Sequence, residues 1–202
     1  DGPGIRFILF TTGCPLRCQY CHNPDTWHLK NGRHVSVDDV MEEIEKYADF
    51  LIESGGGVTI SGGEPLFQDK FLANILRRCQ DRGIHTALDT SGFLGDRMTQ
   101  QMMDDTDLVL LDIKSADPDT YKQVTGVRLD PTLKFAHRLS DMGKPIWLRF
   151  VLVPDLTDNF YEVENLAEFA ATLKSLERVE VLPFHKMGEH KWEALGLKYK
   201  LK

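Results

Sequence analysis

Short apolar runs alternate along the whole chain with longer segments of helical periodicity. The runs are rich in β-branched and aromatic residues and predict six strands, at 5–11, 58–61, 85–89, 108–112, 145–153 and 178–183. The segments between them have the spacing of amphipathic helices. Strands that alternate with helices are the order expected of βα units, which build a parallel sheet. The pattern therefore predicts an α/β fold.

Two of the helical segments have especially clear apolar stripes. The segment 37–52 follows Ser36, a residue type that caps helix N-termini, and its stripe consists of Val37, Val40, Ile44, Tyr47, Ala48 and Leu51. The segment 159–173 has a similar stripe, formed by Val163, Leu166, Ala167, Ala170 and Leu173. Helical spacing over 71–79 also places Cys79 among apolar residues, so we interpret Cys79 as a buried thiol of the core.

Polar residues and glycine follow five of the predicted strands directly. These segments are the loop that contains Cys14, Gly62-Gly63-Glu64, Asp89-Thr90-Ser91-Gly92, Asp112-Ile113-Lys114 and Pro183-Phe184-His185. Each segment alone is also compatible with an ordinary turn or helix cap. Because active sites of α/β sheets and barrels lie at the carboxyl ends of the strands, we expect the five segments to share one rim.

Three cysteines, Cys14, Cys18 and Cys21, lie within eight residues in the spacing C-x3-C-x2-C. Structural zinc sites are closed by four protein ligands, and most iron–sulfur clusters take four cysteines. Three thiolates therefore indicate a [4Fe–4S] cluster with one iron open to a small molecule. A Cys3His zinc site that also uses His22 is the alternative, although a ligand next to Cys21 would strain tetrahedral geometry.

The 202-residue chain has a formal net charge of −7. Its length is sufficient for one domain, residues 1–202, with a substantial core. The acidic charge argues against non-specific binding to nucleic acid or to an anionic membrane. Without a disulfide framework, a signal peptide or a long apolar run, we expect a reducing, cytoplasmic location. Because Asp1 is not an initiator methionine and Leu201-Lys202 closes the chain without a final helix, we expect truncation at both termini.

In their order and spacing these motifs resemble the radical S-adenosylmethionine (SAM) superfamily, and within it the activases of glycyl radical enzymes. The resemblance is carried by Cys14-x3-Cys18-x2-Cys21, Ser61-Gly62-Gly63-Glu64, Leu88-Asp89-Thr90-Ser91-Gly92-Phe93, Leu111-Asp112-Ile113-Lys114, Trp147-Leu148-Arg149, Leu182-Pro183-Phe184-His185 and His190-Lys191-Trp192. These motifs span nearly the whole chain. The resemblance implies a partial (β/α)6 barrel of parallel strands with its active site at the carboxyl ends of the strands.

The resemblance also implies roles for individual residues. Cys14, Cys18 and Cys21 would hold a [4Fe–4S] cluster whose open iron is chelated by SAM. The residues that would contact SAM are Tyr20, Cys21, His22, Gly62, Gly63, Glu64, Asp112, Ile113, Lys114 and His185. A monovalent-cation site would use Asp89, Thr90 and Asp112, and the partner's peptide would meet Asp1, His22 and Arg149. From the strand alternation Arg149 faces away from Ile146, Leu148 and Phe150, and a surface ion pair is its alternative role.

In such enzymes flavodoxin or ferredoxin reduces the cluster, SAM is cleaved to methionine and a 5′-deoxyadenosyl radical, and this radical takes hydrogen from a glycine of the partner enzyme. The stretch from Cys21 to Gly55 contains no further cysteine. By resemblance this favours pyruvate formate-lyase as the partner, activated by a monomer. A radical SAM enzyme for another glycyl radical enzyme or a small molecule, and a non-catalytic iron–sulfur or zinc module, are the alternatives. The polar rim argues against a simple module.

Overall fold

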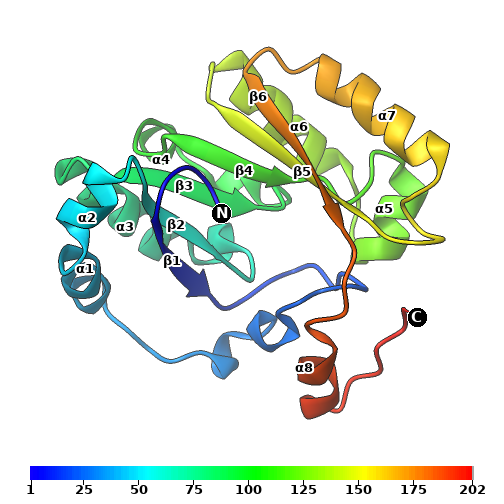
Figure 1. Ribbon diagram of the computed structural model, residues 1–202, viewed down its shortest axis with the longest axis horizontal. Helices are drawn as coiled ribbons and strands as arrows, with labels where there is room; N and C mark the ends of the chain where they lie inside the picture. Colours follow the sequence, from blue (N-terminus) through cyan, green and yellow to red (C-terminus); the bar gives the residue numbers. More distant parts are fainter. Residues whose placement is uncertain (202) are drawn as a thin grey trace.

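The computed structural model describes residues 1–201, and its centre is one six-stranded parallel sheet (Figure 1). The strands are β1 (Arg6–Thr11), β2 (Gly57–Gly62), β3 (His85–Thr90), β4 (Leu108–Asp112), β5 (Ile146–Leu152) and β6 (Leu176–Pro183). They are hydrogen-bonded in the order of the sequence, so β1 and β6 form the two edges. The predicted α/β fold with six parallel strands is confirmed, as an open partial barrel.

Helices connect the strands and cover one face of the sheet (Figure 1). They are α1 (Val37–Glu45), α2 (Ala48–Glu53), α3 (Asp69–Asp81), α4 (Gln100–Asp104), α5 (Pro118–Thr125), α6 (Asp130–Asp141) and α7 (Phe160–Ala171), whereas α8 (Glu189–Ala194) follows β6 and lies apart from the sheet, beside Pro24–Thr26. Short 3-10 turns occupy Pro24–Thr26, Leu29–Asn31, Pro65–Gln68 and Gly95–Arg97. None of the helices in residues 1–201 has both the length and the apolar character needed to cross a bilayer.

The prediction of one continuous helix over 37–52 is wrong, because the chain bends between α1 and α2. The amide of Tyr47 bonds to the carbonyl of Ile44, three residues back, and Tyr47 has φ −119° and ψ 2°. The bend leaves the Tyr47 side chain 52% exposed while Ala48 and Leu51 stay buried. The start of the segment is as predicted, since the Ser36 hydroxyl accepts a hydrogen bond from the Asp39 amide at 3.1 Å.

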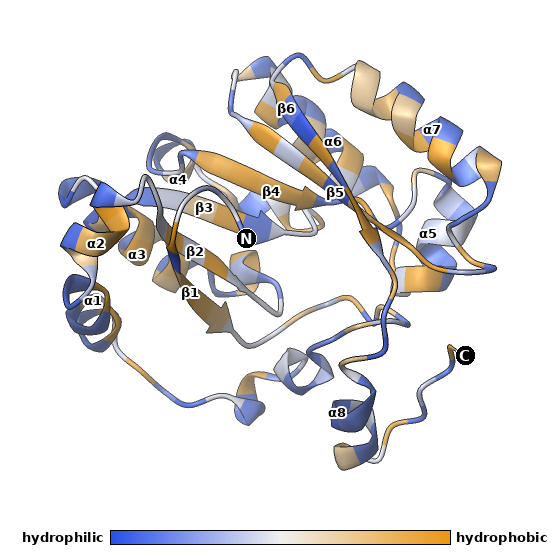
Figure 2. Cartoon of the chain, viewed as in Figure 1, coloured by the Kyte–Doolittle hydropathy of each residue, from blue (hydrophilic) through white to orange (hydrophobic). Residues whose placement is uncertain are grey.

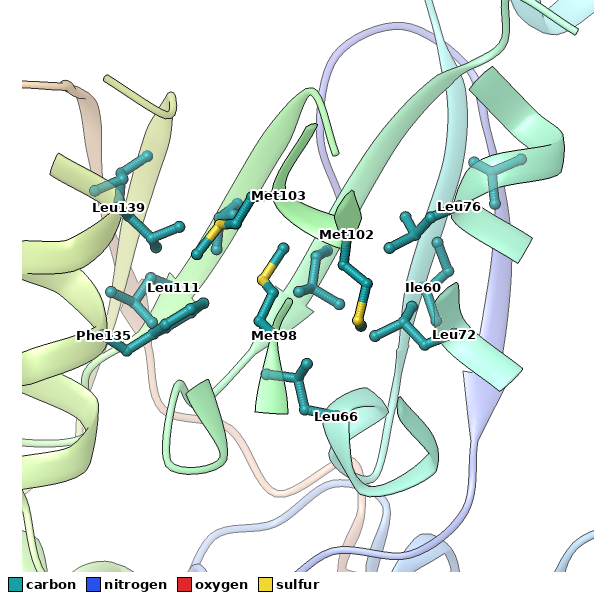
Figure 3. Packing of buried hydrophobic residues seen from close by; sticks show 14 of the residues in the cluster. Ile60, Leu66, Leu72, Leu76, Met98, Met102, Met103, Leu111, Phe135 and Leu139 are labelled. Atoms are coloured by element: carbon teal, nitrogen blue, oxygen red, sulfur yellow. The ribbon is translucent and has the colours of Figure 1, made fainter. Parts of the chain in front are cut away.

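The main core lies between the sheet and its covering helices. Figure 3 shows Ile60 of β2 and Leu111 of β4 packed against side chains of the surrounding helices. Cys79 on α3 is fully buried in this core, which confirms its interpretation as a core thiol. Figure 2 shows how apolar residues concentrate on the strands, whereas the helices carry both apolar and polar residues. The predicted stripe of α7 is partly wrong, because Val163 is 44% exposed.

The other face of the sheet is the interior of the open barrel. Ala87, Leu108 and Leu110 form a small apolar cluster there, with Trp147 packed against it. Because side chains alternate along a strand, the residues two positions beyond these on the same face include Asp89, Asp112 and Arg149. The inner face is therefore apolar around Ala87, Leu108 and Leu110 and charged near the carboxyl ends of β3, β4 and β5.

Candidate active site

A cavity of about 530 Å³ opens where the six strands end. The residues predicted for the site that line it are Asp1, Cys14, Cys18, Tyr20, Cys21, His22, Gly62, Gly63, Asp89, Thr90, Asp112, Lys114, Arg149 and His185. The expectation that the segments after the strands share one rim is therefore confirmed. Of the predicted residues, Glu64 and Ile113 do not line the cavity and are buried beneath its surface.

Several residues that line the cavity were not predicted as site residues. Phe10, Leu16, Trp27 and Val151 add apolar surface, and Ser61 and Ser91 add hydroxyl groups. Leu16 and Trp27 flank the cysteines in space because the Cys14 amide bonds to the Trp27 carbonyl at 3.1 Å. A single sequence cannot reveal such neighbours, since their contribution to the site depends on which loops fold together.

The main chain of the cysteine loop is fixed on two sides. On one side the amides of Arg17 and Gln19 donate to the carbonyls of Thr125 and Val124, at 2.7 and 3.0 Å. On the other side the indole nitrogen of Trp192 donates to the Cys21 carbonyl at 2.8 Å. These bonds occupy main-chain atoms of the loop, and all three of its cysteines line the cavity.

Helix α8 also holds the loop that follows the cysteines. The ammonium group of Lys191 donates to Asn23 Oδ1 at 2.8 Å and forms an ion pair with Asp25 at 3.2 Å. Gly188 lies so close to the main chain of His22 that a Cβ there would be 2.6 Å from the His22 Cα. The His190-Lys191-Trp192 motif therefore positions the cysteine loop, a role that the sequence did not indicate.

The three thiols are protonated in the absence of a metal. Burial raises the pKa of Cys14 to about 12, and burial also raises the pKa of Cys18 and of Cys21 above the usual range. Since thiolates are the metal ligands, cluster binding must displace these protons.

The donor arrangement does not favour a single metal ion. Within residues 1–201, no group of three or more His, Cys, Asp and Glu side chains is arranged to hold one. A tetrahedral zinc site would bring its sulfur atoms to about 3.8 Å from one another, given a Zn–S distance near 2.3 Å. The ring of His22, the fourth ligand of the zinc alternative, stacks on His185 and its Nε2 lies 3.0 Å from the His185 carbonyl oxygen. Thiols that bind separate irons of a cluster need no such close approach, so the three cysteines fit a [4Fe–4S] group.

Gly62 and Gly63 lie against the main chain of β1 and the cysteine loop. Gly62 has a φ of +111°, and a Cβ there would lie 2.4 Å from the Thr11 main chain. A Cβ on Gly63 would lie 2.6 Å from the Gly13 carbonyl oxygen. The amides of Gly63 and Glu64 donate to the Thr11 and Gly13 carbonyls, whereas the Gly63 carbonyl accepts no hydrogen bond within residues 1–201. The Gly63 carbonyl can therefore accept a hydrogen bond from a ligand's amine. The amides of Gly63 and Glu64 are already bonded to protein carbonyls and cannot donate to a ligand.

Glu64 is only 1% exposed and bonds entirely to protein groups. One carboxylate oxygen accepts from the Thr90 hydroxyl at 2.6 Å and the Leu66 amide at 3.3 Å. The other accepts from the amide and hydroxyl of Ser91 at 3.0 and 2.6 Å. Burial raises the pKa of Glu64, and the hydrogen bonds from Ser91 and Thr90 oppose that shift. The side chain therefore supports the cavity from behind.

Arg149 is the centre of a buried ion-pair network. Its guanidinium bonds to Asp89, to Asp112 at 3.0 Å and to Asp1 at 3.4 Å. Burial lowers the pKa of Arg149, but Asp112 and Asp89 outweigh burial and raise it. The alternative of a surface ion pair is wrong, because Arg149 is 8% exposed.

Asp112 also bonds to Lys114, at 2.7 Å. Burial acts to raise the pKa of Asp112, but Arg149 and Lys114 hold it at about 2. Burial and the neighbouring Asp112 raise the pKa of Asp89, against Arg149. The predicted cation-site residues Asp89 and Asp112 therefore already share the positive charge of Arg149, with the Thr90 hydroxyl turned to Glu64.

Tyr20 and Ile113 are buried beside the charged residues. The Tyr20 ring lies 5.9 Å from the Lys114 nitrogen and packs with Val124 and Val153. Ile113 is fully buried in the main core, and its amide donates to the Arg149 carbonyl at 3.1 Å. The Ile113 side chain therefore belongs to the core, and only its main chain is next to residues of the cavity.

Comparison with known proteins agrees with this geometry. The model of the radical SAM superfamily matches residues 8–170. The pyruvate formate-lyase-activating enzymes of Staphylococcus epidermidis and Staphylococcus aureus are each 47% identical to the chain over 208 aligned positions, covering 100% of this chain and 83% of theirs. The chain belongs to the pyruvate formate-lyase-activating enzyme family of the radical SAM superfamily.

Two solved structures share the fold. A domain of pyruvate-formate lyase-activating enzyme from Bacteroides vulgatus is 30% identical with a TM-score of 0.60, over 73% of this chain and 96% of that one. SuiB of Streptococcus suis, solved with its precursor peptide SuiA, has a TM-score of 0.75 at 20% identity, over 99% of this chain and 42% of that one. Membership of the radical SAM superfamily implies a [4Fe–4S] cluster and SAM as cofactors, and the donor set described above fits the cluster.

Proposed function

We propose that this radical SAM chain activates pyruvate formate-lyase by generating a glycyl radical on it. The observation that carries the proposal is the cavity itself, which is lined by the three cysteines, by a charged rim and by Gly63 with its free carbonyl. The full-length match to pyruvate formate-lyase-activating enzymes supports the choice of partner. When bound, the cluster and SAM would supply the one-electron cleavage that yields methionine and a 5′-deoxyadenosyl radical.

The residues of the chain divide the work of binding SAM. We expect Cys14, Cys18 and Cys21 to hold the cluster and the Gly63 carbonyl to accept a hydrogen bond from the SAM amino group. Lys114 and His185 would contact SAM from the far side, and the main chain of residues 20–22 would pack on the adenine. The apolar lining by Leu16 and Val151 supports exclusion of water, which a reactive carbon radical requires.

Asp89, Thr90 and Asp112 would hold a monovalent cation near the SAM carboxylate. Such a cation would have to share Asp89 and Asp112 with Arg149, which bonds to both. Asp1, His22 and Arg149 would meet the glycine loop of the partner. The ion pair between Asp1 and Arg149 lies at the cavity. The main chain of an entering peptide could therefore form hydrogen bonds with either side chain in place of that pair.

Further expectations concern the setting of the reaction. Residues 1–202 would act as one radical SAM domain, since a single sheet carries all the strands. We expect a cytoplasmic monomer that receives its electron from flavodoxin or ferredoxin.

The deciding experiment is an anaerobic assay on reconstituted protein. The chain is loaded with iron and sulfide, reduced, and mixed with SAM and pyruvate formate-lyase, and EPR spectra are recorded while 5′-deoxyadenosine is quantified. A glycyl radical doublet together with 5′-deoxyadenosine supports the proposal. Deoxyadenosine without a protein radical would move the substrate elsewhere, and no SAM cleavage at all would contradict the proposed activity.

A further inference from the structure

The chain before β1 folds back over the inner face of the sheet (Figure 1). We call residues 1–4 the arm. Asp1 lies over the middle of the sheet rather than beside the edge strand, and its carboxylate meets Arg149 of β5 at 3.4 Å. Gly2 has a φ of +102°, and a Cβ there would lie 2.9 Å from the Arg6 Cδ. The arm therefore packs directly on the side chain of Arg6.

Arg6, the first residue of β1, points to the inner face of the sheet. Phe7 and Leu9 pack against the main core, so the alternation along β1 places the side chains of Arg6 and Phe10 on the opposite face. Phe10 lines the cavity, whereas Arg6 lies farther from the carboxyl ends of the strands and does not line it. Arg6 can therefore affect a ligand in the cavity only through its neighbours.

The Arg6 guanidinium joins the arm to two strands. Its Nη1 donates to the Pro3 carbonyl in the arm at 3.2 Å. Its Nε donates to the Thr59 hydroxyl on β2 at 2.5 Å. Its Nη2 donates to the carbonyls of Val58 on β2, at 2.5 Å, and of His85 on β3, at 3.3 Å. One side chain thus bonds to three segments that are far apart in the sequence.

Thr59 extends this set of bonds to Asp1. Thr59 is fully buried, and its hydroxyl accepts from Arg6 and donates to the Asp1 carbonyl at 2.8 Å. Arg6 and Thr59 therefore hold the arm at two of its carbonyls. Although the Asp1 side chain is 59% exposed, these bonds keep its carboxylate within reach of Arg149.

A guanidinium suits this position because it is a planar fork with five donors. A lysine ammonium carries its donors at one point and would not reach acceptors on three segments. Burial lowers the pKa of Arg6 to about 10, against Asp107, so the charged group is held here at a cost in free energy. An apolar residue would avoid that cost but would leave the carbonyls of the arm unbound.

We propose that Arg6 is a positioning residue for the partner's glycine peptide, which it affects by holding the arm so that the Asp1 carboxylate stays at the cavity. The inference rests on the proposed function, in which Asp1 and Arg149 meet that peptide. A loose arm would deprive the peptide of its contact with Asp1, whereas the cysteines and Gly63 would keep their places. Arg6 and Thr59 therefore control peptide binding and not SAM binding.

The test uses reconstituted protein loaded with SAM and a labelled synthetic peptide that has the glycine-loop sequence of pyruvate formate-lyase. Peptide affinity is measured by fluorescence anisotropy and SAM affinity by calorimetry, and 5′-deoxyadenosine formation at varied peptide concentration gives KM and kcat. Arg6→Gln removes the fork, with Arg82→Gln, at an exposed arginine elsewhere, as the control for charge. Thr59→Val removes only the hydroxyl, and Thr59→Ser, which keeps a hydroxyl, is its matched control.

We expect Arg6→Gln and Thr59→Val each to weaken peptide binding and to raise the KM for the peptide about tenfold, the effect of one lost hydrogen bond of ordinary strength. The kcat, the SAM affinity and the iron content should stay within about twofold of the wild type, because the cysteine loop and Gly63 do not contact Arg6. Thr59→Ser and Arg82→Gln should match the wild type in every measurement.

Asp1→Asn tests whether Arg6 acts through Asp1. Asp1→Asn alone should weaken peptide binding, and adding Arg6→Gln should cause little further loss, since both changes remove the same contact. Losses that multiply would overturn the proposal, as would wild-type peptide affinity in both Arg6→Gln and Thr59→Val. Equal losses of peptide affinity, SAM affinity and iron would also overturn it, by showing a purely structural role. If the wild type cleaved SAM but formed no glycyl radical on pyruvate formate-lyase, the proposed function would fail, whatever the variants bind.

Discussion

Glu64 accepts two hydrogen bonds from Ser91, one from the backbone amide at 3.0 Å and one from the hydroxyl at 2.6 Å. Together with the bonds from Thr90 and Leu66, they engage both carboxylate oxygens. The hydrogen-bonded carboxylate therefore ties the loop after β2 to the loop after β3. In this arrangement Glu64 affects a ligand through the position of Thr90 and Ser91, both of which line the cavity.

Glu64→Gln should loosen the loop after β3. The glutamine amide has only one acceptor oxygen, so its NH2 group would face hydrogen-bond donors that the second carboxylate oxygen now satisfies. Each buried donor left without a partner costs about 1–3 kcal/mol. A loss of about 1.4 kcal/mol of binding free energy lowers affinity tenfold. We therefore expect SAM affinity, measured by calorimetry, to fall about tenfold or more. Hydrogen exchange at the amides of Ser91 and Gly92 should rise even without SAM. Unchanged exchange would indicate that Glu64 acts by direct contact instead, and the exposed Glu53→Gln serves as the control.

Cys18→Ala and Cys79→Ala should separate the cluster cysteines from the core cysteine. Loss of the Cys18 thiol removes one of three ligands, so we expect loss of most iron and of SAM cleavage. Cys79 is fully buried on α3, so its truncation should cost about 1 kcal/mol of unfolding free energy through a small cavity and leave the iron content unchanged. Iron and sulfide analysis with urea denaturation gives both quantities. Iron retained by Cys18→Ala would exclude the three-cysteine site.

Gly63→Ala should damage the site through the main chain. Its new Cβ would lie 2.6 Å from the Gly13 carbonyl oxygen, so the loop after β2 must move away from the cysteine loop. We expect both SAM affinity and cluster content to fall, because the two loops share this contact. The matched control is Gly83→Ala, whose new Cβ would have no neighbour within 4 Å but whose backbone is strained by a φ of +66°. This variant shows the effect of a loss of stability without a change in the site. A Gly63→Ala protein with normal SAM affinity would contradict the role of this close approach.

Asp112→Asn should alter the dependence of stability on pH. Arg149 and Lys114 hold the folded pKa of Asp112 at about 2, against a usual value of 3.8. A lowered carboxyl pKa contributes stability above about pH 4 that is lost as the pH falls toward 2, here about 2 kcal/mol. The difference in unfolding free energy between wild type and variant should therefore shrink between pH 5 and pH 2. Urea titrations of the cluster-free protein measure it, and a constant difference would contradict the ion-pair assignment.

The sequence was sufficient to predict the elements whose signal is local. Apolar runs marked the six strands, and glycine and polar residues after them marked the rim. The bend at Tyr47 was missed because an unbroken apolar stripe does not reveal where a helix turns to follow a curved sheet. The buried state of Arg149 was also missed, because it depends on carboxylates from three distant segments that only the fold brings together.

Contacts between the ends of the chain were equally out of reach. The bond from Trp192 to the Cys21 carbonyl joins residues 171 positions apart. Neither residue type nor local spacing indicates such a partner, so the sequence could identify the cysteine ligands but not what holds them.

The bond from Trp192 to Cys21 also sets an order of events during synthesis of the protein. The cysteines leave the ribosome first, whereas Trp192 of α8 follows 171 positions after Cys21. Until then the loop lacks both Trp192 and Lys191, and its thiols can exchange metal or oxidise freely. Stable insertion of the cluster is therefore expected only after α8 has folded back onto the cysteine loop.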